Sequence, residues 1–169
     1  MYNEFSYTSR PRNKVANYVL LGLGGSAAIF VAAAYLTPKY SGIVWTVAFA
    51  LIVSVIYVYT RYVGAEFTYS VMDAGTESFV VTQKVGKTVK TMARIDVSSI
   101  TEIRRMTGKE YKKYKAARGV VKYCYLPTMC PDEVYLLSMR SIHEDADIFI
   151  EADEDFIAAL NERRRITEI

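Results

Sequence analysis

Two uncharged apolar runs near the N-terminus constrain this chain more than any other feature. Residues 15–36 and residues 41–60 contain no Asp, Glu, Lys, Arg or His. As a helix rising about 1.5 Å per residue, each run can cross a hydrocarbon core of roughly 30 Å. A short segment with Pro38 separates the runs, and proline ends a helix. The sequence therefore predicts a two-helix transmembrane hairpin over residues 15–62.

The charges that flank the runs indicate how the hairpin is oriented. The N-terminal segment 1–14 is basic and Arg61 follows the second run, whereas the connecting turn has only Lys39. Because positive charge accumulates on the cytoplasmic side, we expect both termini in the cytoplasm and the chain in the plasma membrane. A cleaved signal peptide is the competing interpretation, since residues 32–34 offer an A-x-A pattern, but a second full-length run follows at once.

Small residues crowd the first run at a spacing that allows close helix packing. Gly22 and Ser26 are four residues apart, as are Gly24 and Ala28, and Gly25 lies between them. This face packs either on the second helix of the same hairpin or on a second copy or partner subunit. Neither run has an ionisable residue in its core, so we do not expect transport by this chain alone.

After residue 64 the pattern changes to short strands separated by turn residues. Strands are predicted over residues 67–72, 78–84, 87–95, 101–106, 120–126, 133–140 and 146–151. In the third of these we expect Val89, Met92 and Ile95 on the buried side. Consecutive strands without intervening helices favour an antiparallel meander that curls into a barrel or sandwich.

The chain closes with a predicted amphipathic helix. Asp153 is a suitable N-cap, and an apolar stripe follows at Phe156, Ile157 and Leu160. Arginines 163–165 fall in the last turn, where the helix dipole favours cations. The predicted fold class is α+β: a transmembrane hairpin followed, over residues 64–169, by a β-barrel or sandwich capped by a C-terminal helix.

Three segments carry a resemblance to a known family. The opening strand 67–72, the step at residues 94–100 and the closing strand and helix at residues 148–160 resemble the membrane-anchored bacterial pleckstrin-homology-like (PH-like) domain proteins. That resemblance implies a basic N-terminus, a two-helix hairpin, and a helix that plugs one end of an open barrel. Eukaryotic PH domains often bind phosphoinositides through a basic first loop, but the corresponding turn here, residues 73–77, is acidic.

No pattern of catalytic or metal-binding chemistry stands out. The chain has no nucleophile elbow, phosphate loop or dinucleotide fingerprint. His143 lies in a polar turn beside carboxylates, which is typical of a solvated side chain. Cys124 and Cys130 lack the C-x-x-C spacing of a zinc site, and because the domain is predicted to be cytoplasmic we expect free thiols. We therefore expect no enzyme, no cofactor and no metal.

The segment 104–122 is the most informative part of the soluble region. The net charge of the chain is only +3, yet this segment concentrates eight basic residues: Arg104, Arg105, Lys109, Lys112, Lys113, Lys115, Arg118 and Lys122. Beside a membrane anchor, such a patch attracts anionic lipid by roughly 1 kcal/mol per basic residue. A solvated loop is the alternative, and nucleic acid is not an expected partner.

These observations lead to two hypotheses about function. The first is a non-enzymatic, membrane-anchored interaction module on the cytoplasmic face, which docks onto anionic lipid headgroups or a protein partner. The second is a structural or accessory subunit of a larger membrane complex, assembled through the small-residue face of the hairpin.

Overall fold

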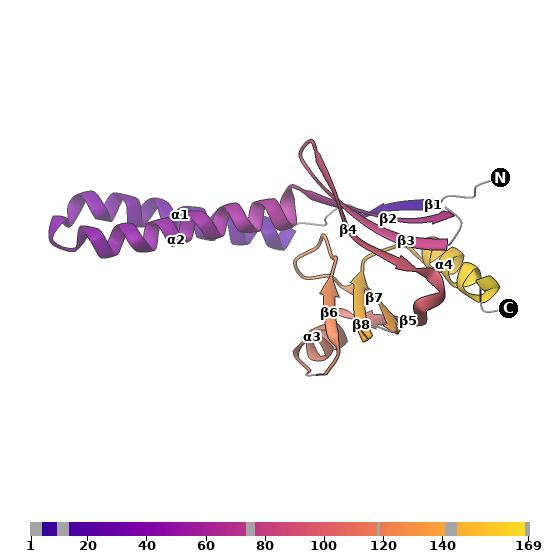
Figure 1. Ribbon diagram of the computed structural model, residues 1–169. Helices are drawn as coiled ribbons and strands as arrows, with labels where there is room; N and C mark the ends of the chain where they lie inside the picture. The colour runs from indigo at the N-terminus through magenta and orange to yellow at the C-terminus, as the bar shows by residue number, and fades with distance from the viewer. Residues whose placement is uncertain (1–4, 10–13, 74–76, 118, 141–144, 168–169) are drawn as a thin grey trace.

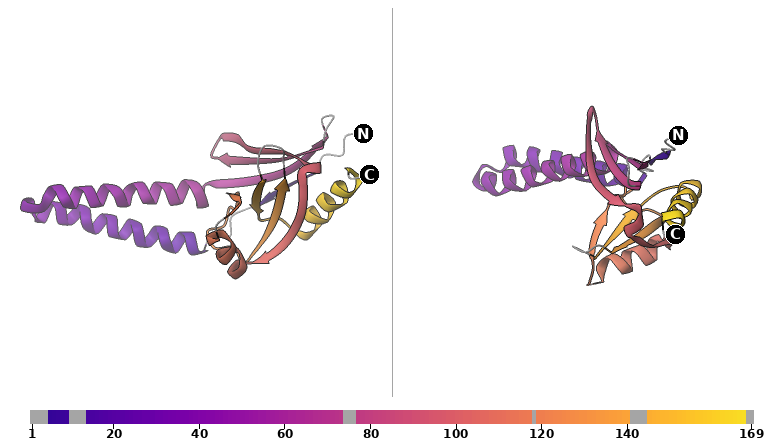
Figure 2. Two further views of the ribbon diagram at one scale, coloured as in Figure 1. Left: turned by 60° about the horizontal axis from the view of Figure 1, so that its bottom comes forward. Right: turned by 45° about the vertical axis from the view of Figure 1, so that its right-hand side comes forward.

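The computed structural model describes residues 5–9, 14–73, 77–117, 119–140 and 145–167. A long helical hairpin projects from one side of a β-rich domain (Figure 1). The C-terminal helix lies on the opposite side of that domain (Figure 2). His143 and Arg118 lie outside the described residues.

Two helices form the hairpin and confirm the prediction for residues 15–62. The elements are α1 (Lys14–Leu36), the 3-10 turn η1 (Pro38–Tyr40), α2 (Ser41–Val58) and the π-helical turn η2 (Tyr59–Val63). By length and composition both helices are suited to crossing a membrane, and together they fit a transmembrane hairpin.

Alanine, not glycine, lines the contact between the two helices. Ala27, Ala34 and Ala48 are buried. In contrast, a methyl group added at Gly22, Gly24 or Gly25 would meet no neighbouring atom within 4 Å. An added methyl group therefore has room at these three glycines, and the close contact between α1 and α2 depends on the buried alanines among the small residues of α1.

Ser26 and Ala28 were also predicted to pack against another helix. Ser26 donates a hydrogen bond to the Gly22 carbonyl in its own helix at 2.8 Å. Gly22, Gly25 and Ala28 are exposed on α1, whereas Gly24 and Ser26 are half-buried.

Two four-stranded sheets form the domain. The first has the order β1-β2-β3-β4 and is antiparallel throughout. Its strands are β1 (Phe5–Ser9), β2 (Ala65–Asp73), β3 (Glu77–Val85) and β4 (Thr88–Asp96). The second has the order β5-β7-β8-β6. Its strands are β5 (Ile100–Thr107), β6 (Val121–Cys124), β7 (Glu133–Arg140) and β8 (Asp145–Ile150).

Strand β1 was not predicted and changes the domain boundary. It pairs with β2 from Phe5 opposite Val71 to Ser9 opposite Phe67. The domain is therefore not confined to residues 64–169, and the hairpin is an insertion between its first two strands. Because β1 and β2 are hydrogen-bonded neighbours, both ends of the hairpin must lie on the same side of any membrane that it spans.

Strand β6 departs from the predicted meander. It pairs with β8 in parallel, from Val121 opposite Ala146 to Cys124 opposite Phe149. The chain reaches this edge of the second sheet only after crossing its outer face as a helix, so it enters β6 in the same direction as β8. Among the described strands the two sheets stay separate, as a sandwich rather than a closed barrel.

Aromatic side chains dominate the core between the sheets. Phe156 of helix α4 (Glu154–Thr167) contacts the rings of Phe5, Tyr7, Tyr69 and Phe79 at centroid distances of 5.2 to 6.4 Å. Helix α4 therefore plugs the sandwich, as the resemblance implied.

The predicted stripe and N-cap of this last helix are confirmed. Phe156, Ile157 and Leu160 are buried in the core. The Asp153 carboxylate accepts a hydrogen bond from the Phe156 amide at 2.9 Å. Arg163 was expected only to interact favourably with the helix dipole. The structure shows that it also forms an ion pair with Glu77 of β3 at 2.7 Å.

The basic segment that follows β5 is an ordered helix, not a loop. Helix α3 (Gly108–Ala116) begins with a capping box, in which Thr107 and Glu110 exchange side-chain to backbone hydrogen bonds. A Cβ on Gly108 would approach the Pro131 carbonyl oxygen to 2.3 Å, so only glycine allows this close start. Tyr111 is buried with Met106 and Phe149 in a second cluster, which joins α3 to the outer face of the second sheet.

The burial prediction for β4 is confirmed at one position and wrong at two. Ile95 is buried, but Val89 is 63% exposed and Met92 is 37% exposed. The register of β4 on β3 shifts between Val81 and Thr82, so the alternation of inward and outward side chains does not run unbroken along the strand.

Candidate membrane-facing surface

The hairpin enters the domain without a flexible linker. Turn η2 ends at Val63, and β2 begins two residues later at Ala65. Within η2, Arg61 donates hydrogen bonds to the carbonyls of Leu126 at 3.2 Å and Cys124 at 2.9 Å. These bonds tie the end of the second helix to the last residue of β6 and to the segment that follows it, and so orient the domain on the hairpin.

The position of Arg61 also indicates how deep each part of the protein lies. The uncharged run 41–60 is long enough to cross a hydrocarbon core of about 30 Å, and in a hairpin that crosses one the next residue, Arg61, would fall at the headgroup level. Lys14 begins α1 at the same end of the hairpin. The side of the domain next to these two residues is called the underside below.

Two elements flank the hairpin on the underside. Helix α3 lies on one side of the hairpin end, and the turn between β3 and β4 lies on the other (Figures 1 and 2). Helix α4 is on the far side of the domain. The segment after β6 also lies at the hairpin end, since Leu126 and Met129 line a hollow with Arg61.

Helix α3 divides its lysines between two directions. Lys112 and Lys115 line a hollow of about 330 Å³ together with Arg61. Lys109 and Lys113 are also exposed but do not line that hollow. The side chains that form the hollow come from the hairpin end, α3 and the segment after β6: Arg61, Tyr62, Tyr111, Lys112, Lys115, Ala116, Cys124, Leu126, Thr128 and Met129.

Two of the predicted basic residues have structural roles instead. Arg105 is held in ion pairs with Glu133 and Glu154, both at 2.5 Å. Lys122 donates hydrogen bonds to the carbonyls of Tyr114, at 2.8 Å, and Ala117, and so satisfies the last turn of α3. These contacts neutralise much of the charge of Arg105 and direct the Lys122 ammonium group to backbone carbonyls.

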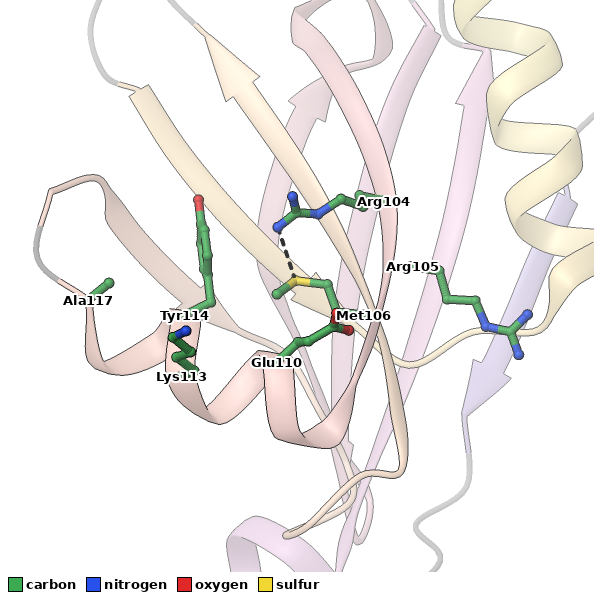
Figure 3. Close-up of a pocket in the computed structure, with 7 residues that line it drawn as sticks. All are labelled: Arg104, Arg105, Met106, Glu110, Lys113, Tyr114 and Ala117. Carbon is green, nitrogen blue, oxygen red and sulfur yellow. Dashed lines mark hydrogen bonds between the residues drawn. The ribbon is translucent and has the colours of Figure 1, made fainter.

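A second hollow, of about 350 Å³, lies between α3 and β5 (Figure 3). It is lined by Arg104, Arg105, Met106, Glu110, Lys113, Tyr114 and Ala117. Figure 3 shows the Arg105 side chain pointing away from α3. Arg104 lies 5.8 Å from the ring centroid of Tyr114 and contacts the Met106 sulfur at 3.8 Å. Because hydrogen bonds from Thr107 lower the pKa of Glu110, this hollow holds a carboxylate as well as cations.

A buried carboxylate fixes α3 on the sheet. Asp147 is only 4% exposed, and it accepts hydrogen bonds from Tyr114 at 2.8 Å and Ser138 at 3.0 Å. The bond to Asp147, together with burial, raises the pKa of the Tyr114 phenol. Helix α3 is therefore a rigid support for its lysines.

The β3–β4 turn is a part of the basic surface that the sequence interpretation missed. Lys84, Lys87 and Lys90 are exposed around Gly86, whose φ of +59° allows the tight turn. Lys84 and Gly86 line a shallow hollow with Val63 and Gly64 of the hairpin end, so the turn lies beside the hairpin. The sequence could have indicated this part of the surface, because the three lysines are spaced three residues apart around a glycine turn.

The remaining chemistry is sparse. Cys124 and Cys130 are free thiols. No three His, Cys, Asp or Glu side chains come together in a way that could hold a metal ion in the described ranges.

A two-sheet sandwich plugged by a C-terminal helix defines this protein as PH-like. The model of the bacterial PH-like domain family DUF6106 matches residues 6–166, so the chain belongs to that family. The match begins within β1 and includes the hairpin, in agreement with a membrane anchor inserted between the first two strands. No curated protein matches the chain.

Proposed function

We propose that this protein is a non-enzymatic, membrane-anchored interaction module that holds its PH-like domain against anionic lipid at the cytoplasmic face of the membrane. The observation that carries the proposal is the placement of exposed cations on both sides of the hairpin end. Lys112 and Lys115 lie on one side, and Lys84 and Lys87 lie on the other. A protein that spans the membrane through the hairpin would bring both groups to the headgroups together.

Electrostatics supports lipid as the partner of this surface. The cytoplasmic leaflet carries a negative surface potential, which attracts each nearby lysine or arginine by about 1 kcal/mol and fades within about a Debye length. The hydrogen bonds of Arg61 tie the hairpin end to the domain, and Lys112, Lys115 and Lys84 line hollows next to that end. The exposed Val89, beside the β3–β4 turn, adds an apolar side chain that can enter the interface.

Hydrogen exchange of the full-length protein in nanodiscs tests this proposal. We expect the amides of α3 and of the β3–β4 turn to exchange more slowly in discs containing phosphatidylglycerol than in discs of phosphatidylcholine alone. Helix α4, on the far side, is the internal control and should not respond. The difference should shrink in about 1 M salt, where the Debye length is about 3 Å. Equal exchange in both discs would reject lipid docking and favour a protein partner.

A second candidate function is that of an accessory subunit of a membrane complex. It is favoured by the glycine face of α1, where added methyl groups at Gly22, Gly24 and Gly25 would meet no atom of this chain. Leucine at Gly24 and Gly25 should abolish crosslinking to a partner in the native membrane while the PH-like domain stays folded. Unchanged crosslinking would remove this face from consideration.

A further inference from the structure

The hollow beside Arg61 is suited to one molecule rather than to a diffuse layer of lipid. We propose that it binds the phosphate headgroup of a single anionic phospholipid, held by Arg61, Lys112 and Lys115. This inference rests on the proposed function, because it requires the underside to face the bilayer. It adds a discrete site with a defined stoichiometry.

The charges around the hollow favour a phosphate. Among the described residues, its lining side chains include three cations and no Asp or Glu. The neighbouring phenol adds no negative charge, because burial and a hydrogen bond to the Cys124 thiol raise the pKa of Tyr111. Lys115 lies 5.6 Å from the centroid of the Tyr111 ring, which holds its ammonium group next to the hollow.

Arg61 provides the fixed part of the site. Its guanidinium donates to the carbonyls of Cys124 and Leu126 and lies 5.0 Å from the centroid of the Phe67 ring. A guanidinium has five N–H donors, so donors remain for phosphate oxygens, which it recognises in a planar fork. An arginine already held in place loses little conformational entropy when the anion binds.

The size and depth of the hollow indicate a lipid as the source of the phosphate. Its volume of about 330 Å³ is at the lower end for small-molecule pockets, large enough for a headgroup but not for acyl chains. Arg61 directly follows the apolar run, so the hollow lies at the level of lipid phosphates. Leu126 and Met129 give it an apolar wall against which the glycerol end of a lipid can pack.

Native mass spectrometry of the full-length protein released from micelles tests the site. We expect one phosphatidylglycerol to remain bound per chain at low lipid concentration, and phosphatidylcholine to bind far more weakly. The double variant Lys112→Gln with Lys115→Gln should bind phosphatidylglycerol about thirtyfold more weakly, which corresponds to about 2 kcal/mol. The matched control Lys109→Gln with Lys113→Gln removes the same charge from the same helix and should change the affinity less than about threefold.

Three outcomes would overturn the site. Unchanged binding by Lys112→Gln with Lys115→Gln would show that the hollow is not used. Equal weakening by the two double variants would show diffuse attraction without a site. Inorganic phosphate or glycerol 3-phosphate binding as tightly as the lipid would show a site for a free phosphate compound.

The variant Arg61→Lys tests whether phosphate binding requires the planar guanidinium group of Arg61 or only its positive charge. It keeps the positive charge but replaces a planar fork of five donors by an ammonium group with three, so we expect weaker phosphatidylglycerol binding by a folded protein. Binding equal to that of the unmodified protein would contradict the proposed role of Arg61. If the site fails but the nanodisc exchange still depends on anionic lipid, the proposed function stands. If hydrogen exchange in nanodiscs does not depend on anionic lipid, both the site and the proposed function are rejected.

Discussion

The hairpin and the PH-like domain bury their apolar side chains in opposite ways. In the domain the largest aromatic residues are inside, as with Phe67 and Phe79, which are at most 1% exposed. In the hairpin the small alanines are inside, whereas Leu21 and Ile43 are at least 70% exposed. The domain therefore carries its own core, whereas the outer surface of the hairpin is apolar and exposed, as suits a helix pair that crosses a bilayer. Arg61 lies where these two kinds of packing meet.

Removal of a core aromatic should show the largest difference between the two regions. Phe156→Ala should lower the free energy of unfolding of the domain by about 3–5 kcal/mol, because four aromatic rings lose a common neighbour. Denaturant unfolding of the full-length protein in micelles, followed by near-UV circular dichroism, measures the effect. The control Phe49→Ala removes a ring that is 68% exposed on the hairpin and should leave the domain transition unchanged.

Loss of the Arg61 contacts should uncouple the two regions. Arg61→Met removes two charge-assisted hydrogen bonds and leaves the carbonyls of Cys124 and Leu126 without these donors. A cost of about 1.5–3 kcal/mol is expected. Hydrogen exchange should become faster in η2 and in the segment after β6, while the core strands keep their protection. Uniform loss of protection would instead indicate that Arg61 stabilises the whole fold.

Enlarging a small residue should distinguish the inside of the hairpin from its outside. Ala48→Leu adds volume where the helices meet and should destabilise the hairpin by about 1–3 kcal/mol. Gly24→Ala, on the open face, should have little effect on packing within the hairpin. Titration of detergent-solubilised protein with dodecyl sulfate, followed by helicity, compares the two variants. An equal loss of hairpin stability in the two variants would contradict the placement of Ala48, and not Gly24, at the contact between the helices.

The smallest expected effect is a pH dependence of α3. The pKa of Glu110 is lowered by its hydrogen bonds from Thr107, so its contribution to the helix is present above its ordinary pKa of 4.5. That contribution should be lost as the pH falls through the lowered value. Amide exchange of α3 in micelles, corrected for intrinsic rates, should accelerate over that acidic range. Glu110→Gln should remove the pH dependence, and a dependence that persists would assign it to another group.

Local patterns predicted much of this architecture. The hairpin was evident because two long runs carry no charge, and helix α4 was evident from its N-cap and apolar stripe. Features that depend on distant contacts were not predicted. The side chains of β1 alternate over only five residues, and its partner β2 follows the hairpin. The parallel pairing of β6 with β8 likewise joins segments far apart in the chain.

The candidate surface was predicted only in part. Lys112 and Lys115 of the basic segment lie beside the hairpin end, but composition alone did not reveal that the segment forms a helix. Thr107 and Glu110 have the spacing of a capping box and could have indicated its start. Composition also could not separate Lys112 from Arg105, because only folding brings Glu133 and Glu154 to Arg105.

The central claim is that α3 and the β3–β4 turn lie against the lipid headgroups while α4 faces away. Fluorescent amino acids incorporated at positions 112, 87 and 165 of the full-length protein, in anionic nanodiscs with a quencher on the lipid headgroups, test it directly. All three positions are exposed and basic, so the labels replace equal charges. The account predicts strong quenching at positions 112 and 87 and little at position 165. Quenching at position 165 as strong as at the other two, or none at positions 112 and 87, would contradict it.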